Sequence, residues 1–275
     1  MTEKTAENAN ASMPENIVDR PLVSIITPTY NSADFIEETI SSVMKQEYQN
    51  WEHIIVDDAS TDGTALAVNE LISQDSRIKF IQLETNSGAA IARNTAISAA
   101  AGRYIAFLDA DDLWLPAKLS VQIEYMLRTG ASFTFSSYGL IDGSGDKIGS
   151  VEVPKKATYN SLLRNNWIGC LTAVYDTEQI GKIKMPLIRK RQDLGLWLRI
   201  LKQIPQAEGL KETLAMYRVR PGSISHNKVD AARYTWQLYR HVEALPFLYA
   251  VYYFSCYALN GLFKTRHKPF RPDLA

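Results

Sequence analysis

The chain has 275 residues, and its 30 Lys and Arg residues balance 30 Asp and Glu residues, so the formal net charge is zero. A neutral chain lacks the overall positive field with which proteins attract DNA or RNA, so no nucleic-acid partner is expected. The two cysteines, Cys170 and Cys256, form no CxxC or Cys/His spacing, which argues against structural zinc and a disulfide scaffold and favours the cytoplasm.

Residues 1–20 are polar and slightly acidic, without the basic start and apolar stretch of a secretory signal, and we expect a disordered lead-in there. From Pro21 onward, short apolar runs alternate with segments of helical periodicity. This alternation predicts an α/β protein with a mainly parallel central sheet flanked by helices. The expected strands are 22–27, 53–56, 78–83 and 104–108, and the expected helices are 35–44, 65–72 and 88–101.

The alternation weakens beyond Lys155, and we interpret the second half as an extension of the same domain. Two glycines around a serine at 143–145 predict a hairpin turn. Further helices are expected at 159–164 and 193–203, and further strands at 171–175 and 214–219.

Polar residues follow each of the first four strands, at the sheet edge where ligands bind in open α/β folds. These clusters are residues 28–31, 57–63, 86–88 and 109–112. The first turn has no glycine, and neither GxGxxG nor GxxxxGK[ST] occurs in the chain. A dehydrogenase of the dinucleotide-binding type and a P-loop NTPase are therefore disfavoured.

The sharpest local motif is Asp109-Ala110-Asp111, at the end of an apolar strand. Strand alternation points the two carboxylates to the same side, where they repel each other unless a cation or a proton compensates. Mg²⁺ and Mn²⁺ take carboxylate oxygens, often with substrate phosphate completing the shell, so a metal and diphosphate site is one interpretation. The other is that these acids cap the next helix.

The clusters occur in an order that resembles family 2 glycosyltransferases. The matching segments are residues 23–31, 56–64, 86–88 with 92–94, 107–112, 192–199, and 217–218 with 221–225, so the likeness covers about 21–225. It is closest in character to bacterial enzymes that build capsule, teichuronic acid or O-antigen polysaccharides. The resemblance implies a GT-A fold, with a nucleotide-sugar-binding half at 21–115, an acceptor half at 116–225 and a helical tail at 226–275.

The resemblance also implies roles for individual residues in donor binding. The nucleotide-sugar-binding residues would be Pro28, Tyr30, Asp57, Asp58, Gly88, Arg93, Asn94, Asp109 and Arg218. Tyr30 would stack on the base, Asp58 would accept the uracil N–H, and Asp57 would assist or support the turn. Arg93 would contact base or phosphate, although alone it would be taken for a helix-surface residue.

In the same comparison, Asp109 meets the ribose and Asp111 binds Mn²⁺ or Mg²⁺, with Asp112 as a competing ligand. Trp114 is expected to pack in the core. Asp193 matches the catalytic base, although an Asp at the head of an amphipathic helix is also a usual N-terminal cap. Many relatives have two acids at this point, whereas here Gln192 precedes Asp193.

Basic residues flank the expected base on both sides in the sequence. Residues 189–191 are Arg-Lys-Arg, which form either a solvated loop or a contact to a donor diphosphate or an acceptor phosphate. Near the Pro-Gly turn at 221–222 stand Arg218, Arg220 and His226. The resemblance suggests a lid over the donor there, with Arg218 the first candidate among the three.

The tail from residue 228 to 275 has seven Lys and Arg against three Asp and Glu, a net charge of +4, and many aromatic residues. This composition favours a membrane surface. Residues 244–263 carry no charge and nearly reach the length of a bilayer span. We expect a helical hairpin lying on the membrane and broken near Pro246; a single span and a buried docking helix are the alternatives.

The leading hypothesis is a metal-dependent inverting transferase that moves a hexose from a UDP-sugar to a polyprenyl-diphosphate-linked saccharide, at the inner face of the bacterial membrane. A sugar-phosphate nucleotidyltransferase is a second class, but no Gly-rich basic signature follows the first strand. A non-catalytic nucleotide-sugar-binding module is a third, and the intact Asp111 and Asp193 argue against it.

Overall fold

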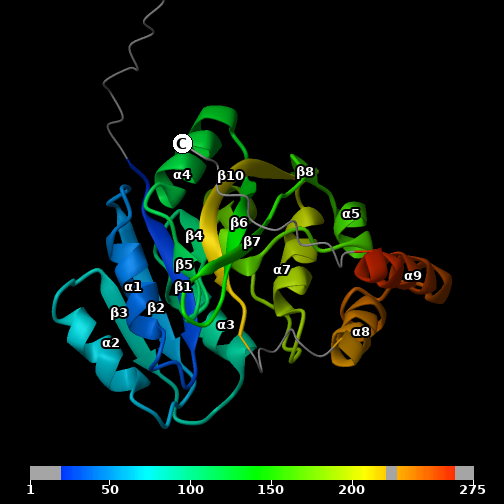
Figure 1. The fold of residues 1–275 in the computed structure, drawn as a ribbon. Coiled ribbons are helices and arrows are strands. Elements are labelled where there is room, and N and C mark those ends of the chain that lie inside the picture. Colours follow the sequence, from blue (N-terminus) through cyan, green and yellow to red (C-terminus); the bar gives the residue numbers. More distant parts are fainter. Residues whose placement is uncertain (1–19, 221–227, 264–275) are drawn as a thin grey trace, which may run out of the picture.

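The computed structural model describes residues 20–220 and 228–263. The predicted lead-in, apart from Arg20, and the turn at 221–225 with His226 lie outside the described residues, as does the basic end of the tail. The described strands form one sheet in the order β3-β2-β1-β4-β9-β6-β10-β5, with β7 paired to β6 and β8 to β10. Figure 1 shows helices covering both sides of this sheet.

The N-terminal half of the sheet is wholly parallel. Its strands are β1 (Val23–Thr29), β2 (Trp51–Asp57), β3 (Ile78–Gln82) and β4 (Tyr104–Phe107). The helices between them are α1 (Ile36–Met44), α2 (Thr64–Ile72) and α3 (Ala89–Ala99). The first four predicted strands and first three predicted helices are confirmed to within a few residues, and all four strands end at the same edge.

The C-terminal half makes the sheet mixed. β9 (Val174–Asp176) runs antiparallel to β4 and to β6 (Phe133–Ile141), whereas β10 (Ala207–Arg218) is parallel to β6. The remaining strands are β5 (Leu113–Trp114), β7 (Lys147–Val151) and β8 (Lys156–Ala157). The turn predicted at 143–145 joins β6 to β7, as expected.

Two predicted strands differ from the observed ones. The strand expected at 171–175 begins only at Val174, because a 3-10 turn at Cys170–Thr172 precedes it. Thr172 donates from its hydroxyl to the Gly169 carbonyl at 2.8 Å, which stabilises that turn. The strand expected at 214–219 is part of the longer β10, whose first residues pair with β6 and β8.

The helices of the second half are α4 (Lys118–Thr129), α5 (Tyr159–Arg164), α6 (Thr177–Ile180) and α7 (Gln192–Leu201). Both predicted helices, α5 and α7, are confirmed. At the start of α5, Thr158 and Ser161 exchange side-chain hydrogen bonds with each other's backbone N–H, a capping box that satisfies donors at the helix end.

Strand alternation divides the core into two layers, one on each face of the sheet. Ile26 and Ile54 point to the layer under α3, α5 and α7, whereas Ile25 and Ile55 point to the layer under α1, α2 and α4. Trp197 of α7 is fully buried in the first layer, where its ring lies 5.4 Å from Phe107 and 5.2 Å from Phe133. The core therefore anchors α7 to β4 and β6. Trp114 is buried in the second layer, as predicted.

The last described elements form the predicted helical hairpin. α8 (Lys228–Gln237) continues through a π-helical turn (Leu238–Val242), and α9 (Phe247–Phe263) follows after a break at Pro246. One face of α9 docks on α5, where the Tyr253 hydroxyl lies 2.9 Å from Asn160 Oδ1. Within the described ranges, no helix combines the length and apolar content needed to cross a membrane.

The core also buries a histidine whose titration is testable. His53 of β2 is fully buried; its Nε2 lies 2.8 Å from Thr27 Oγ1, and its Nδ1 has no partner within the described structure. Burial lowers the pKa of His53 to about 3. The unfolded chain binds this proton near pH 6.5 and the folded chain only near pH 3, so stability is lost as the pH falls between these values.

We therefore expect the free energy of unfolding to fall by up to ~1.4 kcal/mol per pH unit below pH 6.5 through His53 alone. Urea denaturation of the wild type and of His53→Gln between pH 7 and pH 5 measures this contribution, because the variant lacks the titrating ring. The wild-type curve should be the steeper of the two. Parallel curves would contradict the assignment.

Candidate active site

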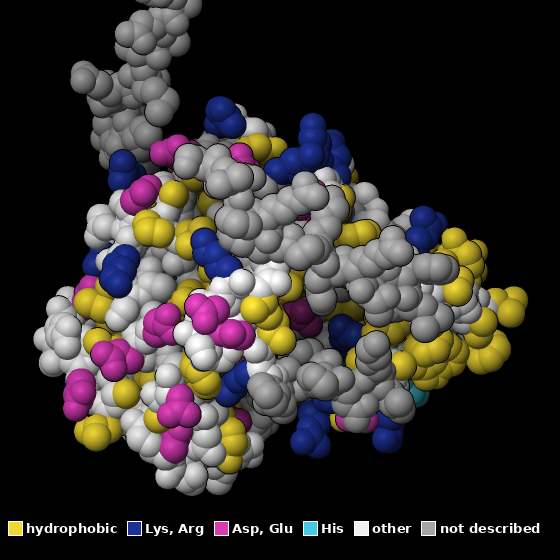
Figure 2. Space-filling model, in the orientation of Figure 1, with side chains coloured by type: hydrophobic (Ala, Val, Ile, Leu, Met, Phe, Trp, Pro, Cys, Tyr) yellow, Lys and Arg dark blue, Asp and Glu magenta, His cyan; other side chains and the backbone are white. Residues whose placement is uncertain are grey.

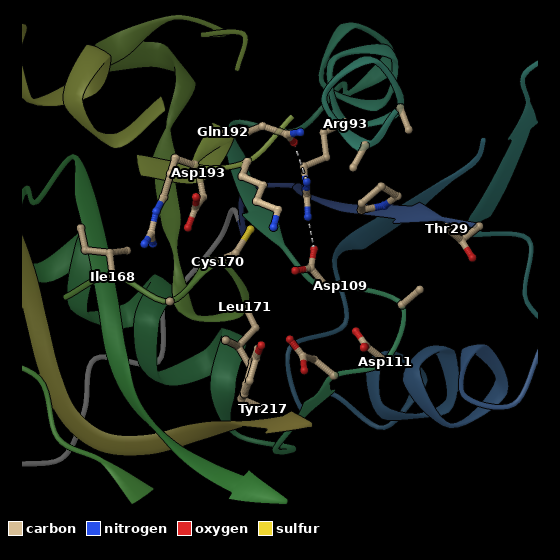
Figure 3. Close-up of a pocket in the computed structure, with 18 of the residues that line it drawn as sticks. Thr29, Arg93, Asp109, Asp111, Ile168, Cys170, Leu171, Gln192, Asp193 and Tyr217 are labelled. Carbon is tan, nitrogen blue, oxygen red and sulfur yellow. Dashed lines mark hydrogen bonds and ion pairs between the residues drawn. The ribbon is translucent and has the colours of Figure 1, made fainter. Parts of the chain in front are cut away.

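A cavity of about 510 Å³ opens at the edge where the parallel strands end. Its walls come from the segments after β1 and β4, from α3, from residues 166–171 and from residues 189–193 at the start of α7. Eight of the twelve predicted site residues line it, namely Pro28, Tyr30, Asp58, Arg93, Asp109, Asp111, Asp112 and Asp193. In Figure 3, Asp109 and Asp111 lie on one side and Asp193 on the other, with Cys170 between them.

Two of the lining residues, Tyr30 and Asp58, present an aromatic ring and a carboxylate to the cavity. Tyr30 is 48% exposed although it lies directly after β1, so one face of its ring is accessible. Asp58 is buried, and its two carboxylate oxygens accept backbone N–H bonds from Ser87 and Gly88, each at 2.7 Å. Gly88 has a φ of 92°, a conformation that favours glycine and brings its N–H to Asp58.

Asp57, Gly88 and Asn94 do not line the cavity, and their contacts explain why. Asp57 accepts hydrogen bonds from the backbone and hydroxyl of Ser60 and so supports the turn, one of the two roles considered for it. The amide of Asn94 exchanges hydrogen bonds of 3.0 and 2.7 Å with the backbone of Met185. Asn94 therefore anchors the segment that leads to α7 and does not face a ligand.

Arg93 is partly buried and connects two parts of the cavity wall. Its guanidinium donates to Asp109 Oδ1 at 2.6 Å and to Gln192 Oε1 at 2.9 Å, as the dashed lines in Figure 3 show. Gln192, which precedes Asp193 in the sequence, is thus held by Arg93. Arg93 connects the end of β4 to the first turn of α7.

Three carboxylates crowd the loop after β4. Asp111 Oδ2 accepts a bond from Arg220 Nε at 2.8 Å, and Asp112 Oδ1 accepts one from the backbone N–H of Arg218 at 2.9 Å. Burial, and then the charge of Asp109, raises the pKa of Asp111; burial, and then the charge of Asp111, raises the pKa of Asp112 well above its usual value. Excess negative charge in a partly desolvated site is what a cation relieves.

The residues present fit a divalent cation that also has phosphate ligands. Asp112 Oδ2 is buried without a hydrogen-bond partner in the described part of the chain, and Asp111 faces the cavity. Among the described residues, no group of three or more His, Cys, Asp or Glu side chains forms a complete metal site. Ligand oxygens would therefore have to complete the shell, as is usual for Mg²⁺ at phosphates.

Arg218 does not occupy the position that we expected from the sequence. It is 2% exposed and lies outside the cavity, where its guanidinium donates to the carbonyls of Asp111, Asp142 and Gly143 and pairs with Glu38 at 2.5 Å. These contacts occupy the N–H donors of its guanidinium and join the loop after β4 to the turn at 142–143 and to α1. Arg220 was a less favoured candidate than Arg218 for contact with the donor, but it lines the cavity and forms an ion pair with Asp111.

Asp193 stands in the first turn of α7 and lines the cavity. The N-cap of the helix is Arg191, in a left-handed conformation with a φ of 68° and without a side-chain cap. Asp193 therefore does not serve as the N-cap, although the positive end of the helix dipole still favours its negative charge. The side-chain amide of Asn166 lies 3.4 Å from Asp193 Oδ2.

Several lining residues were not predicted from the sequence. Asn166, Trp167 and Cys170 come from the irregular segment before β9, and Tyr138 and Tyr217 from β6 and β10, with their rings 6.3 Å apart. Burial, and then the charge of Asp109, raises the pKa of the Cys170 thiol well above its usual value, so this side chain is a neutral part of the wall. These positions form no motif or regular spacing in the sequence from which their shared place in the cavity could have been predicted.

The α/β fold and the acids clustered at the sheet edge are consistent with a glycosyltransferase, and comparisons with known proteins agree. The sequence model described as "Glycosyl transferase family 2" matches residues 24–179. The putative teichuronic acid biosynthesis glycosyltransferase TuaG of Bacillus subtilis is 48% identical over 89% of this chain and 98% of its own length. The chain therefore belongs to glycosyl transferase family 2.

Two further likenesses are informative. An Escherichia coli protein named UDP-Glc:alpha-D-GlcNAc-diphosphoundecaprenol beta-1,3-glucosyltransferase WfgD is 42% identical over 90% of this chain and 96% of its own length. The crystal structure of S. aureus TarS 1-349 in complex with UDP-GlcNAc has a TM-score of 0.67 at 20% identity, covering 90% of this chain and 74% of that one. The latter confirms the GT-A fold.

The different positions of Arg218 and Arg220 can be tested by measuring stability. Arg218→Ala breaks a buried hydrogen-bond network and should lower the free energy of unfolding by roughly 2–4 kcal/mol. Arg220→Ala removes a partly exposed ion pair and should lower it by less than about 1 kcal/mol. Chemical denaturation monitored by circular dichroism compares the two; equal losses would contradict the structural role of Arg218.

Proposed function

We propose that this protein transfers a hexose, with inversion, from a UDP-sugar to a saccharide carried on a polyprenyl diphosphate, in the synthesis of a bacterial surface polysaccharide. The names of the TuaG and WfgD relatives support this pathway and this kind of acceptor. The observation that carries the proposal is that one cavity contains Asp58 and Tyr30, the acids after β4, and Asp193 on the far wall.

In this proposal, the donor binds along the edge of the sheet. The uracil stacks on the exposed ring of Tyr30, and its N–H donates to Asp58, whose orientation is fixed by two backbone bonds. The ribose hydroxyls donate to Asp109, which Arg93 holds in place at 2.6 Å. Arg220 supplies positive charge for the diphosphate.

Asp111, with Asp112 as the second candidate, would hold Mn²⁺ or Mg²⁺. Such an ion, when bound, neutralises charge on the departing nucleoside diphosphate. Arg220 then has a second role, because its ion pair with Asp111 at 2.8 Å holds that carboxylate at the cavity wall.

Asp193 is the proposed general base. It takes the proton from the acceptor hydroxyl as that oxygen attacks the anomeric carbon, and the single displacement inverts the configuration there. The helix end stabilises the carboxylate at some cost to its basicity, so proton transfer becomes effective as the hydroxyl turns acidic in the transition state. Gln192 carries no charge and is engaged with Arg93, which leaves Asp193 as the base.

We propose that the enzyme acts at the inner face of the cytoplasmic membrane. Large side chains on the outer face of α9 are exposed, among them Phe247, Leu248, Tyr249, Tyr252 and Leu259. Figure 2 shows hydrophobic side chains gathered at the end of the molecule where the hairpin lies. Apolar and aromatic side chains of this kind insert at the boundary between lipid headgroups and acyl chains.

Transfer assays test the proposed chemistry. A panel of UDP-sugars with polyprenyl-diphosphate-GlcNAc should give UDP release with at least one donor, and the product should have the anomeric configuration opposite to that of the donor. Asp193→Asn should lower kcat by at least about 100-fold with little change in UDP affinity, because loss of a general base costs about 10²–10⁴ in rate. Asp111→Ala should lower both activity and UDP affinity.

Far-UV circular dichroism and thermal melts should show that both variants remain folded. Wild-type activity in both variants would overturn the assigned roles. Pyrophosphate release from UTP and a sugar phosphate would indicate a nucleotidyltransferase instead.

Binding to vesicles tests the membrane contact. Replacing both Leu248 and Tyr252 by Glu should weaken cosedimentation with phosphatidylglycerol vesicles by about tenfold or more, because two buried apolar side chains become charged. Leu66→Glu on α2, where the leucine is 67% exposed, is the matched control and should bind like the wild type. Equal binding by all three proteins would exclude α9 as the contact.

A further inference from the structure

Three consecutive cations, Arg189, Lys190 and Arg191, line the cavity directly before α7. We call residues 189–191 the basic strip. Asp193 follows two residues later, so the strip belongs to the wall on which the proposed base stands. Figure 2 shows a hollow on this face between the sheet-bearing body and the hairpin, with acidic and basic side chains visible in it.

Arg191 fixes the strip to the C-terminal hairpin. Its Nε donates to Thr235 Oγ1 of α8 at 3.1 Å, one terminal nitrogen donates to the Tyr257 hydroxyl of α9 at 2.5 Å, and the guanidinium lies 5.3 Å from the centre of the Tyr257 ring. The residue also has the left-handed φ of 68° that starts α7. Both helices of the hairpin thus hold the backbone that carries Arg189 and Lys190.

The other two cations are more available to a ligand. Lys190 has a side chain that is 15% exposed, and its Nζ lies 5.9 Å from the centre of the Tyr234 ring and 3.2 Å from Asp230. Because the Asp230 side chain is 45% exposed, solvent weakens this ion pair. Arg189 is exposed at the cavity wall; its backbone carbonyl accepts a bond from Gln192 Nε2 at 3.2 Å, whereas its guanidinium has no hydrogen-bond or ion-pair partner in the part of the chain that the structure describes. A positioned guanidinium without a partner is well suited to bind phosphate oxygens.

The cation proposed for the donor diphosphate is a different one. Arg220 lies at Asp111, after the end of β4, whereas the basic strip lies beside Asp193. An acceptor whose hydroxyl meets Asp193 presents the rest of its sugar, and the groups attached to it, to the surroundings of that residue. The strip is therefore placed to meet an anionic group on the acceptor.

We propose that Arg189 and Lys190 form a subsite for the diphosphate of a lipid-linked acceptor, with the exposed apolar face of α9 on the lipid side. This inference rests on the proposed function, because it takes Asp193 as the point where the acceptor hydroxyl binds. Arg191 orders the subsite by fastening it to α8 and α9. The hairpin thereby connects a membrane contact to acceptor recognition.

Equilibrium binding tests the subsite without requiring turnover. Calorimetric titration in the presence of UDP and Mn²⁺ compares octyl-diphosphate-linked N-acetylglucosamine with the octyl glycoside of the same sugar. Arg189→Gln should weaken binding of the diphosphate compound by about tenfold, and a double variant with Lys190→Gln should weaken it further. Binding of the glycoside and of UDP should stay within twofold of the wild type.

Arg189→Lys, which keeps the charge but not the planar fork, should recover part of the loss. The matched control is Lys211→Gln, because Lys211 is exposed and lies outside the cavity. Unchanged binding of the diphosphate compound by Arg189→Gln would overturn the subsite, and so would an equal loss for the glycoside. A loss of UDP affinity instead would assign the strip to the donor.

The same experiment separates this inference from the proposed function. If no UDP-sugar supports transfer but Arg189→Gln still weakens the diphosphate compound alone, the subsite stands and the reaction assignment fails. If transfer occurs and Arg189→Gln binds the diphosphate compound as the wild type does, the reaction stands and the subsite fails.

Discussion

The arrangement of the site depends on mutual repulsion among Asp109, Asp111 and Asp112 at the end of β4. These three carboxylates lie within four residues in a partly desolvated loop, where burial, and then the charge of the neighbouring acids, raises the pKa of Asp111 and of Asp112. The protein offsets only part of it, through Arg93 at Asp109 and Arg220 at Asp111. These compensating contacts draw α3 and the segment after β10 to the end of β4 and so shape the cavity.

The same contacts connect the loop after β4 to the wall of the cavity formed by the start of α7. Arg93 reaches from Asp109 to Gln192, in the first turn of α7, and Arg191 reaches from that turn to the C-terminal hairpin. Trp197 fixes the middle of α7 in the core against Phe107 of β4. The carboxylate of Asp193 is thus positioned by the packing of Trp197, by the Arg93 contacts and by the hairpin formed by α8 and α9. These contacts include residues beyond 179, where the match to the family model ends.

The features that could be predicted from the sequence are those that local residue patterns determine, namely the strands and helices of the N-terminal half. Apolar runs and helical spacing located the parallel strands and α1 to α3, and since parallel strands end at one edge, the polar clusters that follow them could be grouped from the sequence alone. Contacts between distant segments could not be predicted this way. The orientations of Arg218 and Arg220, two residues apart at the end of β10, depend on Glu38 and on the loop at 142–143, and the antiparallel insertion of β9 beside β4 depends on tertiary pairing.

The most direct test of this account is the dependence of UDP binding on a divalent cation. Calorimetric titration of UDP into the wild-type protein should give at least tenfold tighter binding with Mn²⁺ than with EDTA, because the cation relieves repulsion among the acids after β4 and neutralises the diphosphate. Asp111→Asn should remove most of that difference and leave the fold intact. Equal affinity for UDP with Mn²⁺ and with EDTA in the wild type would contradict the account.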